Sequence, residues 1–522
     1  MELVKETIRM QKRKCKSNLQ MTLEDDFNVP DTKPDVDKII TEEGNIEITE
    51  TNLLNGKWMV KGVLHFQLLY SGQDGEQQVH NIEGRLPFDE MINMEDLQGE
   101  EEVKLRWEIE DLNISLINSR KISVKSLVSL VCCAYEICEE EVATQVEEQQ
   151  DVPCKYETRN MTELVVDKKD VLRLKEEFHL PTGKKNIYQV LYRDIRLEGL
   201  EMRTQEGQIF IRGEMVLFVL YTSQETPGEI EYYEAEQPVH SVIPCNGCME
   251  DMILQVDKEV VSKELQIKPD EDGEERVLEA ELAINLGIAI YREKQMELLA
   301  DLYSTTKQLE IAYADTEFLQ LLTKNTIEKR LGQQFTFEKL ENPIVQICHN
   351  YGNIQLDEVE WREDGIYLEG SVEVKILYLG EQRDWPVGEE KCMIPFTHLI
   401  EKVGNSKNKD FEIYPEIGHI STVLLGRDSV DVKVNLNIEL FVFERKTERQ
   451  MKQITEKEFS PEEVDAMPGM VGYLVKEGED LWSIAKQFHV TIDKIREIND
   501  LENQNVKGGE RLLLSDVRVV DA

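Results

Sequence analysis

The sequence has no apolar run long enough to cross a membrane. Its 522 residues contain no continuous apolar stretch approaching the roughly 20 residues that a membrane-spanning helix needs. The opening segment, residues 1–16, is polar and charged and lacks the apolar core of a secretory signal peptide. We therefore expect no membrane insertion and no export, so that the protein stays in the compartment where it is made.

Basic residues are scarce relative to acidic ones. The chain has 60 Lys and Arg against 104 Asp and Glu, which gives a formal net charge of −44. Such a surface repels nucleic-acid backbones and anionic membranes at long range. The charge therefore argues against a nucleic-acid partner, and it either keeps a large protein soluble or suits a basic protein partner.

Motifs that carry chemistry are scarce as well. The nine cysteines are odd in number and irregularly spaced, which is typical of a reducing cytosol rather than of a disulfide framework. Cys245 and Cys248 form a CxxC, but no second pair follows to complete a zinc site, so we interpret them as core residues. The acidic run at residues 269–275 lacks the spacing of a calcium loop and predicts a solvated hairpin turn. With no phosphate loop, nucleophile elbow or paired-carboxylate motif, we expect no enzyme, no catalytic residue, no metal and no cofactor.

What the chain does have is a threefold internal repeat. Gly62–Tyr70, Gly213–Tyr221 and Gly370–Tyr378 each place a Gly eight positions before a Tyr, with β-branched and aromatic residues between them, at offsets of 151 and 157 residues. Long alternating runs begin at Arg120, Arg276 and Arg427 and have the period of half-buried strands. The sequence therefore predicts a mainly β protein of three tandem antiparallel, sandwich-like domains.

The last fifty residues have a different pattern. Tyr473–Leu514 parses into a strand, a turn, two short helices and a closing strand, a small βααβ domain. Leu481, Ile484, Ala485 and Phe488 recur at helical spacing, and Asp480 stands where a carboxylate caps a helix. We place the three β-domains at 1–145, 146–306 and 307–452, a polar linker at 453–469 and the small domain at 470–516.

This βααβ pattern resembles a LysM domain, a module that binds N-acetylglucosamine polymers or proteins. Repeats with Gly-to-Tyr strands, a Lys33-Pro34-Asp35 segment before Ile39 and Ile40, and a terminal LysM resemble the SipL-type spore coat morphogenetic proteins of clostridia, which carry SPOCS domains. The resemblance covers essentially the whole chain. It implies that the three β-domains are SPOCS domains.

The resemblance also implies a function. Proteins of this family are scaffolds made in the mother cell, and they localise around the forespore during endospore formation. They help to encase it through the coat morphogenetic ATPase called stage IV sporulation protein A, which the LysM module is implicated in binding. We expect that ATPase as the partner, with other coat proteins possible. The alternative is a wall protein that holds peptidoglycan, which would need export.

The candidate binding residues lie in the LysM groove and beside it. Glycan-binding members usually have Gly-Asp-Thr in the turn, whereas this chain has Glu and Asp after the Gly; an unpaired carboxylate is costly to desolvate beside a neutral sugar, which favours a protein ligand. Trp482 lies off the centre of the apolar stripe, so we interpret it as a partly exposed interface anchor, with edge-of-core packing as the alternative. The predicted binding residues are Gly478, Glu479, Asp480, Leu481, Trp482, Asn505, Val506, Lys507, Gly508 and Gly509.

Overall fold

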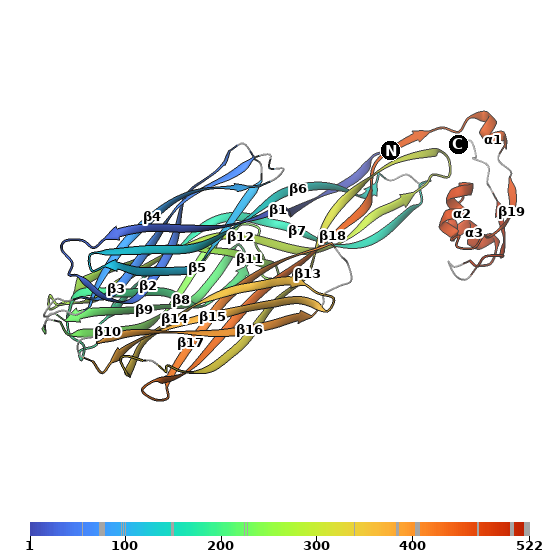
Figure 1. Ribbon diagram of the computed structural model, residues 1–522. Coiled ribbons are helices and arrows are strands. Elements are labelled where there is room, and N and C mark those ends of the chain that lie inside the picture. Colours follow the sequence, from blue (N-terminus) through green and yellow to red (C-terminus); the bar gives the residue numbers. More distant parts are fainter. Residues whose placement is uncertain are drawn as a thin grey trace.

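The computed structural model describes most of the chain. The described residues are 1–54, 56–72, 79–94, 97, 99, 101–147, 151–223, 225–226, 228–338, 340–382, 386–401, 408–466, 469–501 and 506–515. Three β-sandwiches lie side by side at one end, a narrow stalk of paired strands leaves them, and a small helical domain lies at the tip of the stalk (Figure 1). None of the helices in these ranges has the length and apolarity needed to cross a membrane.

Each sandwich contains six strands in two three-stranded antiparallel sheets. In domain 1 the sheets have the orders β1-β6-β5 and β2-β3-β4, and domains 2 and 3 repeat this arrangement. The strands of domain 1 are β1 (Leu3–Asn28), β2 (Val36–Leu54), β3 (Lys57–Gly72), β4 (Val79–Asn93), β5 (Glu102–Asn118) and β6 (Lys121–Val146). Those of domain 2 are β7 (Cys154–His179), β8 (Ile187–Gln205), β9 (Gln208–Ser223), β10 (Ile230–Pro244), β11 (Ile253–Pro269) and β12 (Glu275–Leu302). Those of domain 3 are β13 (Gln308–Thr336), β14 (Ile344–Trp361), β15 (Gly365–Gly380), β16 (Val387–Glu401), β17 (Lys409–Leu424) and β18 (Ser429–Lys457).

The predicted fold class is confirmed. The repeated Gly-to-Tyr segments are the central strands β3, β9 and β15, and the alternating runs are β6, β12 and β18, whose inward residues line the core between the two sheets of each domain. The acidic run at residues 269–275 forms the turn between β11 and β12, closed by the bond from Gly273 N–H to the Asp270 carbonyl. Cys245 and Cys248 are 1% and 2% exposed and belong to the core of domain 2, as interpreted from the sequence.

The first and the last strand of each domain are far longer than the usual strand of 3–10 residues. The strands β1, β6, β7, β12, β13 and β18 each contain 26 to 29 residues. They pair along their whole length, first inside a sandwich and then, beyond it, as a two-stranded ribbon. The three ribbons form the stalk, and their apolar side chains pack against one another in cores of their own.

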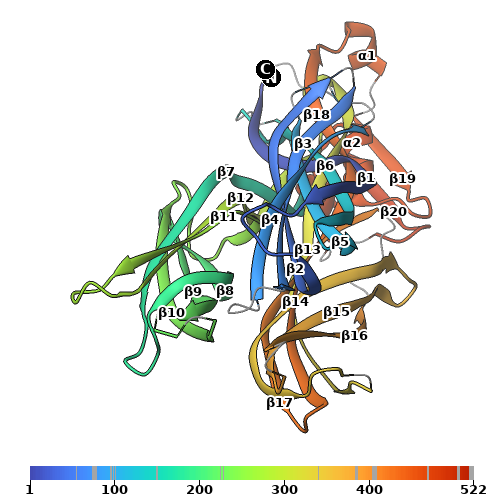
Figure 2. The ribbon, with the colours of Figure 1, turned by 60° about the vertical axis from the view of Figure 1, so that its left-hand side comes forward.

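The three domains are grouped around a common centre (Figure 2). Their β-bulges fall at equivalent places, so that Thr41, Tyr192 and His349, which are related by the offsets of 151 and 157, each directly follow a register shift. The equivalent side chains differ, and they bond across the domain boundaries. Tyr192 donates a hydrogen bond to Glu43 of domain 1 (2.8 Å), and Thr41 is bonded to Glu389 of domain 3.

His349 is a deeply buried member of this inter-domain network. Its ring is 1% exposed, Nδ1 lies 2.8 Å from Glu234 Oε2, and Nε2 lies 3.2 Å from Asp194 Oδ2, both in domain 2. Arg196 also bonds the Asn350 carbonyl at 3.0 Å. Burial alone would lower the pKa of His349, but its hydrogen bonds to Asp194 and Glu234 outweigh burial and raise the pKa above its ordinary value.

The small domain has the expected βααβ order. It consists of β19 (Met470–Leu474), α2 (Leu481–Phe488), α3 (Ile492–Ile498) and β20 (Arg511–Ser515), with β19 paired antiparallel to β20. Asp480 caps α2, as the sequence predicts, and forms a capping box with Ser483, while Thr491 caps α3. The segment placed in the linker is partly ordered, because β18 continues to Lys457 and a short helix, α1 (Pro461–Ala466), follows.

The Gly that begins each Gly-to-Tyr segment permits a neighbouring strand to approach closely, and the distance of that approach differs among the three copies. A Cβ on Gly370 would lie 2.3 Å from the Gln355 carbonyl oxygen, whereas a Cβ on Gly213 would have its nearest neighbour, the Glu198 carbonyl oxygen, at 3.2 Å. We expect Gly370→Ala to destabilise domain 3 by about 1–3 kcal/mol through overpacking, and Gly213→Ala to have a smaller effect on domain 2. Calorimetric unfolding of the two variants checks this, and equal effects would contradict it.

The His349 network gives the stability of the protein a pH dependence. Because the folded pKa is raised, the stabilisation is complete below the unfolded pKa of about 6.5 and is lost as the pH rises through the folded value. We expect His349→Gln to cost about 3 kcal/mol near pH 6, since it breaks a buried charged network, and the difference from the wild type to shrink as the pH rises. Thermal melts between pH 6 and 9 measure it.

The matched control for this change is His240→Gln, because His240 is exposed on β10 and its ring stacks on Phe210. That variant should follow the wild-type curve at every pH. A constant difference between His349→Gln and the wild type over the whole range would show that the imidazole contributes packing alone.

Candidate functional site

The turn after β19 holds three of the predicted binding residues. Gly478 has a φ of +86°, which favours glycine. The carboxylate of Glu479 accepts hydrogen bonds from the Tyr473 hydroxyl (2.9 and 3.0 Å) and from the Lys476 backbone N–H (3.0 Å). Asp480 accepts from the Ser483 N–H at 2.8 Å and caps α2. Both carboxylates are therefore bonded within the domain, and their bonds hold the turn in place.

The second loop of the predicted groove packs against this turn. Gly509 has a φ of +89° and donates its N–H to the Val475 carbonyl at 2.8 Å. Gly508 lies so close to the chain that a Cβ would come within 3.1 Å of Glu477 Cα. Val506 packs against the domain core and Lys507 accepts a backbone bond from Glu510. The structure thus brings both loops together, while Asn505 lies outside the described residues.

Leu481 and Trp482 point in different directions from the same helix. Leu481 is 2% exposed and belongs to the core of the LysM-like domain, so its role is structural. Trp482 lies on the side of α2 that faces the stalk. Its indole Nε1–H donates to Asp301 Oδ2 at 2.8 Å, and its ring meets the Tyr303 ring edge-on, with centroids 5.1 Å apart. The interface anchor expected from the sequence is thus already occupied, by another segment of the same chain.

The rest of this contact comes from α2 and from the residues that follow it. Lys486 Nζ lies 2.5 Å from Asp301 Oδ1, so that one carboxylate binds two donors of α2. The Tyr303 hydroxyl donates to the Val490 carbonyl at 2.8 Å, and His489 Nδ1 lies 2.9 Å from the Ser304 carbonyl oxygen. We call the α2 face that carries Trp482, Lys486 and His489 the α2 docking face.

Charge complementarity stabilises the contact. Burial alone would raise the pKa of Asp301, but the hydrogen bonds from Lys486 and Trp482 outweigh it and hold the pKa below its ordinary value. Asp301 therefore stays ionised, and an ionised acceptor strengthens both bonds. Tyr303 is 2% exposed, and burial raises its pKa, so its hydroxyl remains a donor.

Sequence reasoning did not find Asp301 and Tyr303. They lie where β12 ends and the chain turns toward β13, and nothing local distinguishes them from an ordinary strand end. The residues they contact are about 180 positions further along the chain. Only the packing of three ribbons brings this turn to the tip of the stalk, where the small domain lies (Figure 1).

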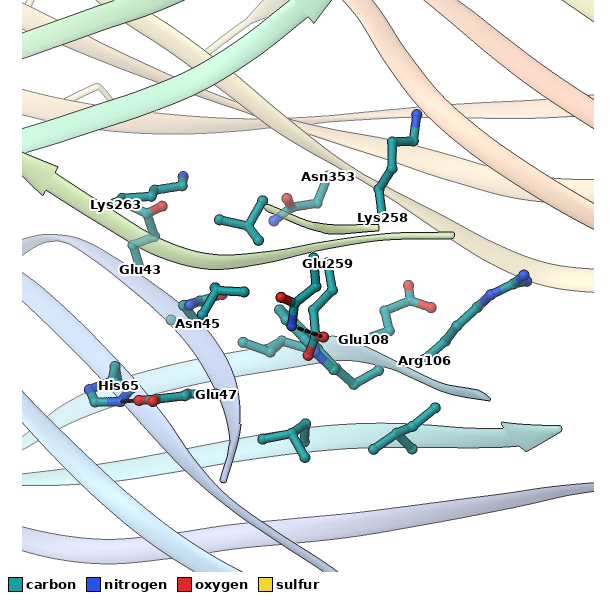
Figure 3. Close-up of a pocket in the computed structure, with 18 of the residues that line it drawn as sticks. Glu43, Asn45, Glu47, His65, Arg106, Glu108, Lys258, Glu259, Lys263 and Asn353 are labelled. Atoms are coloured by element: carbon teal, nitrogen blue, oxygen red, sulfur yellow. Dashed lines mark hydrogen bonds and ion pairs between the residues drawn. The ribbon is translucent and has the colours of Figure 1, made fainter. Parts of the chain in front are cut away.

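A second feature is a cavity of about 1400 Å³ between the three β-domains, lined by residues from all of them (Figure 3). Glu108, Glu259 and Glu416, which are related by the repeat offsets, all line it. Burial, together with nearby Glu110 and Asp357, raises the pKa of Glu108 to about 7.

Several polar groups around the cavity bond to neighbours. His65 pairs with Glu47 at 2.8 Å (Figure 3), Glu259 accepts from Asn285 at 3.2 Å, and Lys258 is paired with Glu416. These bonds hold the lining in place and in part join the domains. Within the described ranges, no group of three or more His, Cys, Asp or Glu is placed to hold a metal ion.

At one end of the cavity a charged pair links the domains. Arg106 of β5 donates to Asp257 of β11 at 2.5 Å, and its guanidinium lies over the ring of Tyr414 of β17, 4.3 Å from the centroid. These three residues are again related by the repeat offsets. The cavity therefore reflects how the repeats meet, and the α2 docking face is the better candidate for a binding site.

Comparison with known families agrees with this architecture. A model of the SipL SPOCS domain matches residues 35–117, 186–268 and 343–425, and a LysM model matches residues 473–515. Each SPOCS match covers four strands of one sandwich, β2–β5, β8–β11 or β14–β17, and leaves out the long first and last strands, which continue into the stalk. Searches of the curated proteins and of the solved structures found no match. With three SPOCS domains in tandem and a carboxy-terminal LysM domain, the chain belongs to the SipL-like proteins.

Proposed function

We propose that this protein is a non-enzymatic scaffold of endospore coat assembly whose LysM domain docks a coat morphogenetic protein. SPOCS and LysM domains in this order fit a coat-associated scaffold. The partner in this proposal is an ATPase similar to stage IV sporulation protein A, with further coat proteins as additional ligands. The site of action is the forespore surface, on the side of the mother-cell cytoplasm.

One observation carries the choice of a protein ligand over a glycan. The LysM domain already holds a polypeptide segment, Asp301–Ser304, through the indole of Trp482, the ammonium of Lys486 and a backbone carbonyl. Trp482 is a partly buried aromatic anchor beside a charge-assisted hydrogen bond, and aromatic anchors of this kind are enriched in protein-binding hot spots. By contrast, the groove carboxylates of Glu479 and Asp480 bond to their own domain.

The alternative function is binding of peptidoglycan or another N-acetylglucosamine polymer, since LysM domains in general bind such glycans. The groove between the Gly478 turn and the Gly508–Gly509 loop is the place where this would occur. Titration of the full chain with soluble chito-oligosaccharide, and separately with the purified ATPase, discriminates between the two. Saturable sugar binding without ATPase binding would reverse the assignment.

Trp482 gives the sharpest test of the protein-binding function. We expect Trp482→Ala in the full chain to weaken capture of the purified ATPase by about tenfold or more, because truncation of a central aromatic anchor costs about 2 kcal/mol or more. Isothermal titration measures the affinity, and hydrogen exchange in α3 and β20 shows whether the domain stays folded.

The matched control is Leu474→Ala, which removes an apolar side chain that is 59% exposed on β19 and lies outside the α2 docking face. It should leave the affinity unchanged. If both variants bind the ATPase as the wild type does, the partner does not use Trp482.

A further inference from the structure

The turn between β12 and β13 forms a ligand-like contact with the LysM domain. Asp301 presents its carboxylate to Trp482 and Lys486, and two positions later Tyr303 inserts its ring against Trp482. Tyr303 is as buried as the core of the LysM domain and packs within it, although it lies far outside the residues that the LysM family model matches. A residue of the stalk therefore completes the core of the neighbouring domain.

The polar atoms of this contact all have partners, and Asp301 Oδ1 also accepts from the Leu302 backbone N–H at 2.9 Å and from the Tyr313 hydroxyl at 3.4 Å. Each oxygen of Asp301 accepts from a donor of α2, the Tyr303 hydroxyl reaches the Val490 carbonyl, and the Ser304 carbonyl oxygen lies 2.9 Å from His489 Nδ1. A buried hydroxyl left without a partner costs about 1–3 kcal/mol, and in the docked state the Val490 carbonyl spares Tyr303 this cost. Elsewhere the domains meet more loosely, as at Lys155 and Asp480, whose charged atoms are 3.8 Å apart.

The chemistry of the bound segment defines what else the face accepts. The α2 docking face offers two donors for a carboxylate, the indole of Trp482 for edge-on contact with a second ring, and, beside it, the Val490 carbonyl as an acceptor for a hydroxyl. A neutral sugar supplies no carboxylate, and a basic segment would meet Lys486. An acidic residue followed two positions later by a tyrosine matches all three features.

We propose that the α2 docking face is a peptide-recognition surface for an acidic–aromatic segment, that Asp301–Ser304 is its intramolecular ligand, and that a protein partner binds by presenting the same chemistry in its place. The identity of that partner rests on the proposed function, whereas the recognition surface does not. When the segment is docked in the same chain, the face is closed to the partner. The apparent affinity for the partner is then the intrinsic affinity multiplied by the fraction of molecules that are undocked. The LysM domain is joined to the stalk by the short segment between β18 and β19, and this tether raises the effective concentration of the intramolecular ligand.

The recognition surface is tested with a peptide of defined sequence. The probe is a fluorescein-labelled peptide of residues 297–306, measured by anisotropy against the full chain carrying Asp301→Asn and Tyr303→Phe. These substitutions keep the size of both side chains and remove the charge and the hydroxyl. We expect saturable binding at least about tenfold tighter than to the wild-type chain, whose face is occupied.

Two controls make this arm decisive. The same peptide with Asp301→Asn should bind at least about tenfold more weakly, because it loses a charge-assisted contact. Adding Trp482→Phe to the chain, which retains a ring but removes the indole N–H, should weaken binding as well. The recognition surface would be overturned by the absence of saturable binding up to millimolar peptide. It would also be overturned if neither Asp301→Asn in the peptide nor Trp482→Phe in the chain changed the affinity.

The second arm tests whether the partner uses the same face. The purified ATPase should bind the Asp301→Asn, Tyr303→Phe chain about tenfold more tightly than the wild type, and a control chain with Lys155→Gln should bind as the wild type does. Unchanged or weaker binding of the double variant overturns the shared face. If the ATPase binds none of the chains, the proposed partner is wrong, while the peptide arm still decides the recognition surface.

Discussion

The continuous pairing of the first and last strands of each domain is the constraint on which the rest of the structure depends. β1 with β6, β7 with β12, and β13 with β18 stay in antiparallel register from the sandwich to the tip of the stalk. Within a sandwich their inward residues face the second sheet, and beyond it they face the other ribbons. Because each ribbon must end where the chain crosses to the next domain, the β12–β13 turn is placed at the tip. The docking of the LysM domain follows from that position.

A single chain can arrange its repeats in a way that three identical subunits cannot. In a symmetric trimer a residue near the axis meets copies of itself, so a charged side chain there faces like charges. Here Arg106, Asp257 and Tyr414 occupy equivalent places, and they form an ion pair with an aromatic face above it. His349 and Tyr192 also occupy equivalent places, and each bonds to a carboxylate of a neighbouring domain. The three copies have become complementary at the positions where they touch.

This divergence explains which parts of the structure could be predicted from the sequence. The alternation of apolar and polar residues in β18, and the pattern of the Gly-to-Tyr strands, arise because these strands are buried between two sheets. Both patterns therefore persist in every copy of the repeat. The caps at Asp480 and Thr491 depend on residues three positions away. The grouping of the domains around a cavity, the stalk, and the contact of Trp482 with Asp301 depend on side chains that are far apart in the sequence, for example 155 positions for His349 and Asp194 and 348 for Thr41 and Glu389. No single segment carries a periodic signal for such pairs. For the same reason the orientation of Trp482 off the apolar stripe could be read from helical spacing, but the residue that covers it could not.

The distribution of hydrogen bonds in the LysM domain bears on where it binds. The carboxylate of Glu479 and Oδ1 of Asp480, in the turn that borders the groove, bond to Tyr473, Lys476 and the first turn of α2. A ligand at these groups would have to break bonds that hold the turn, and it would gain little net free energy from replacing them. On the α2 docking face the indole and the ammonium donate to an acceptor outside the LysM domain, so replacing that acceptor leaves the fold of the domain intact. Exchange of one acidic segment for another on this face needs no rearrangement of the core beyond the ring of Tyr303, and that ring is the feature a competing segment has to reproduce.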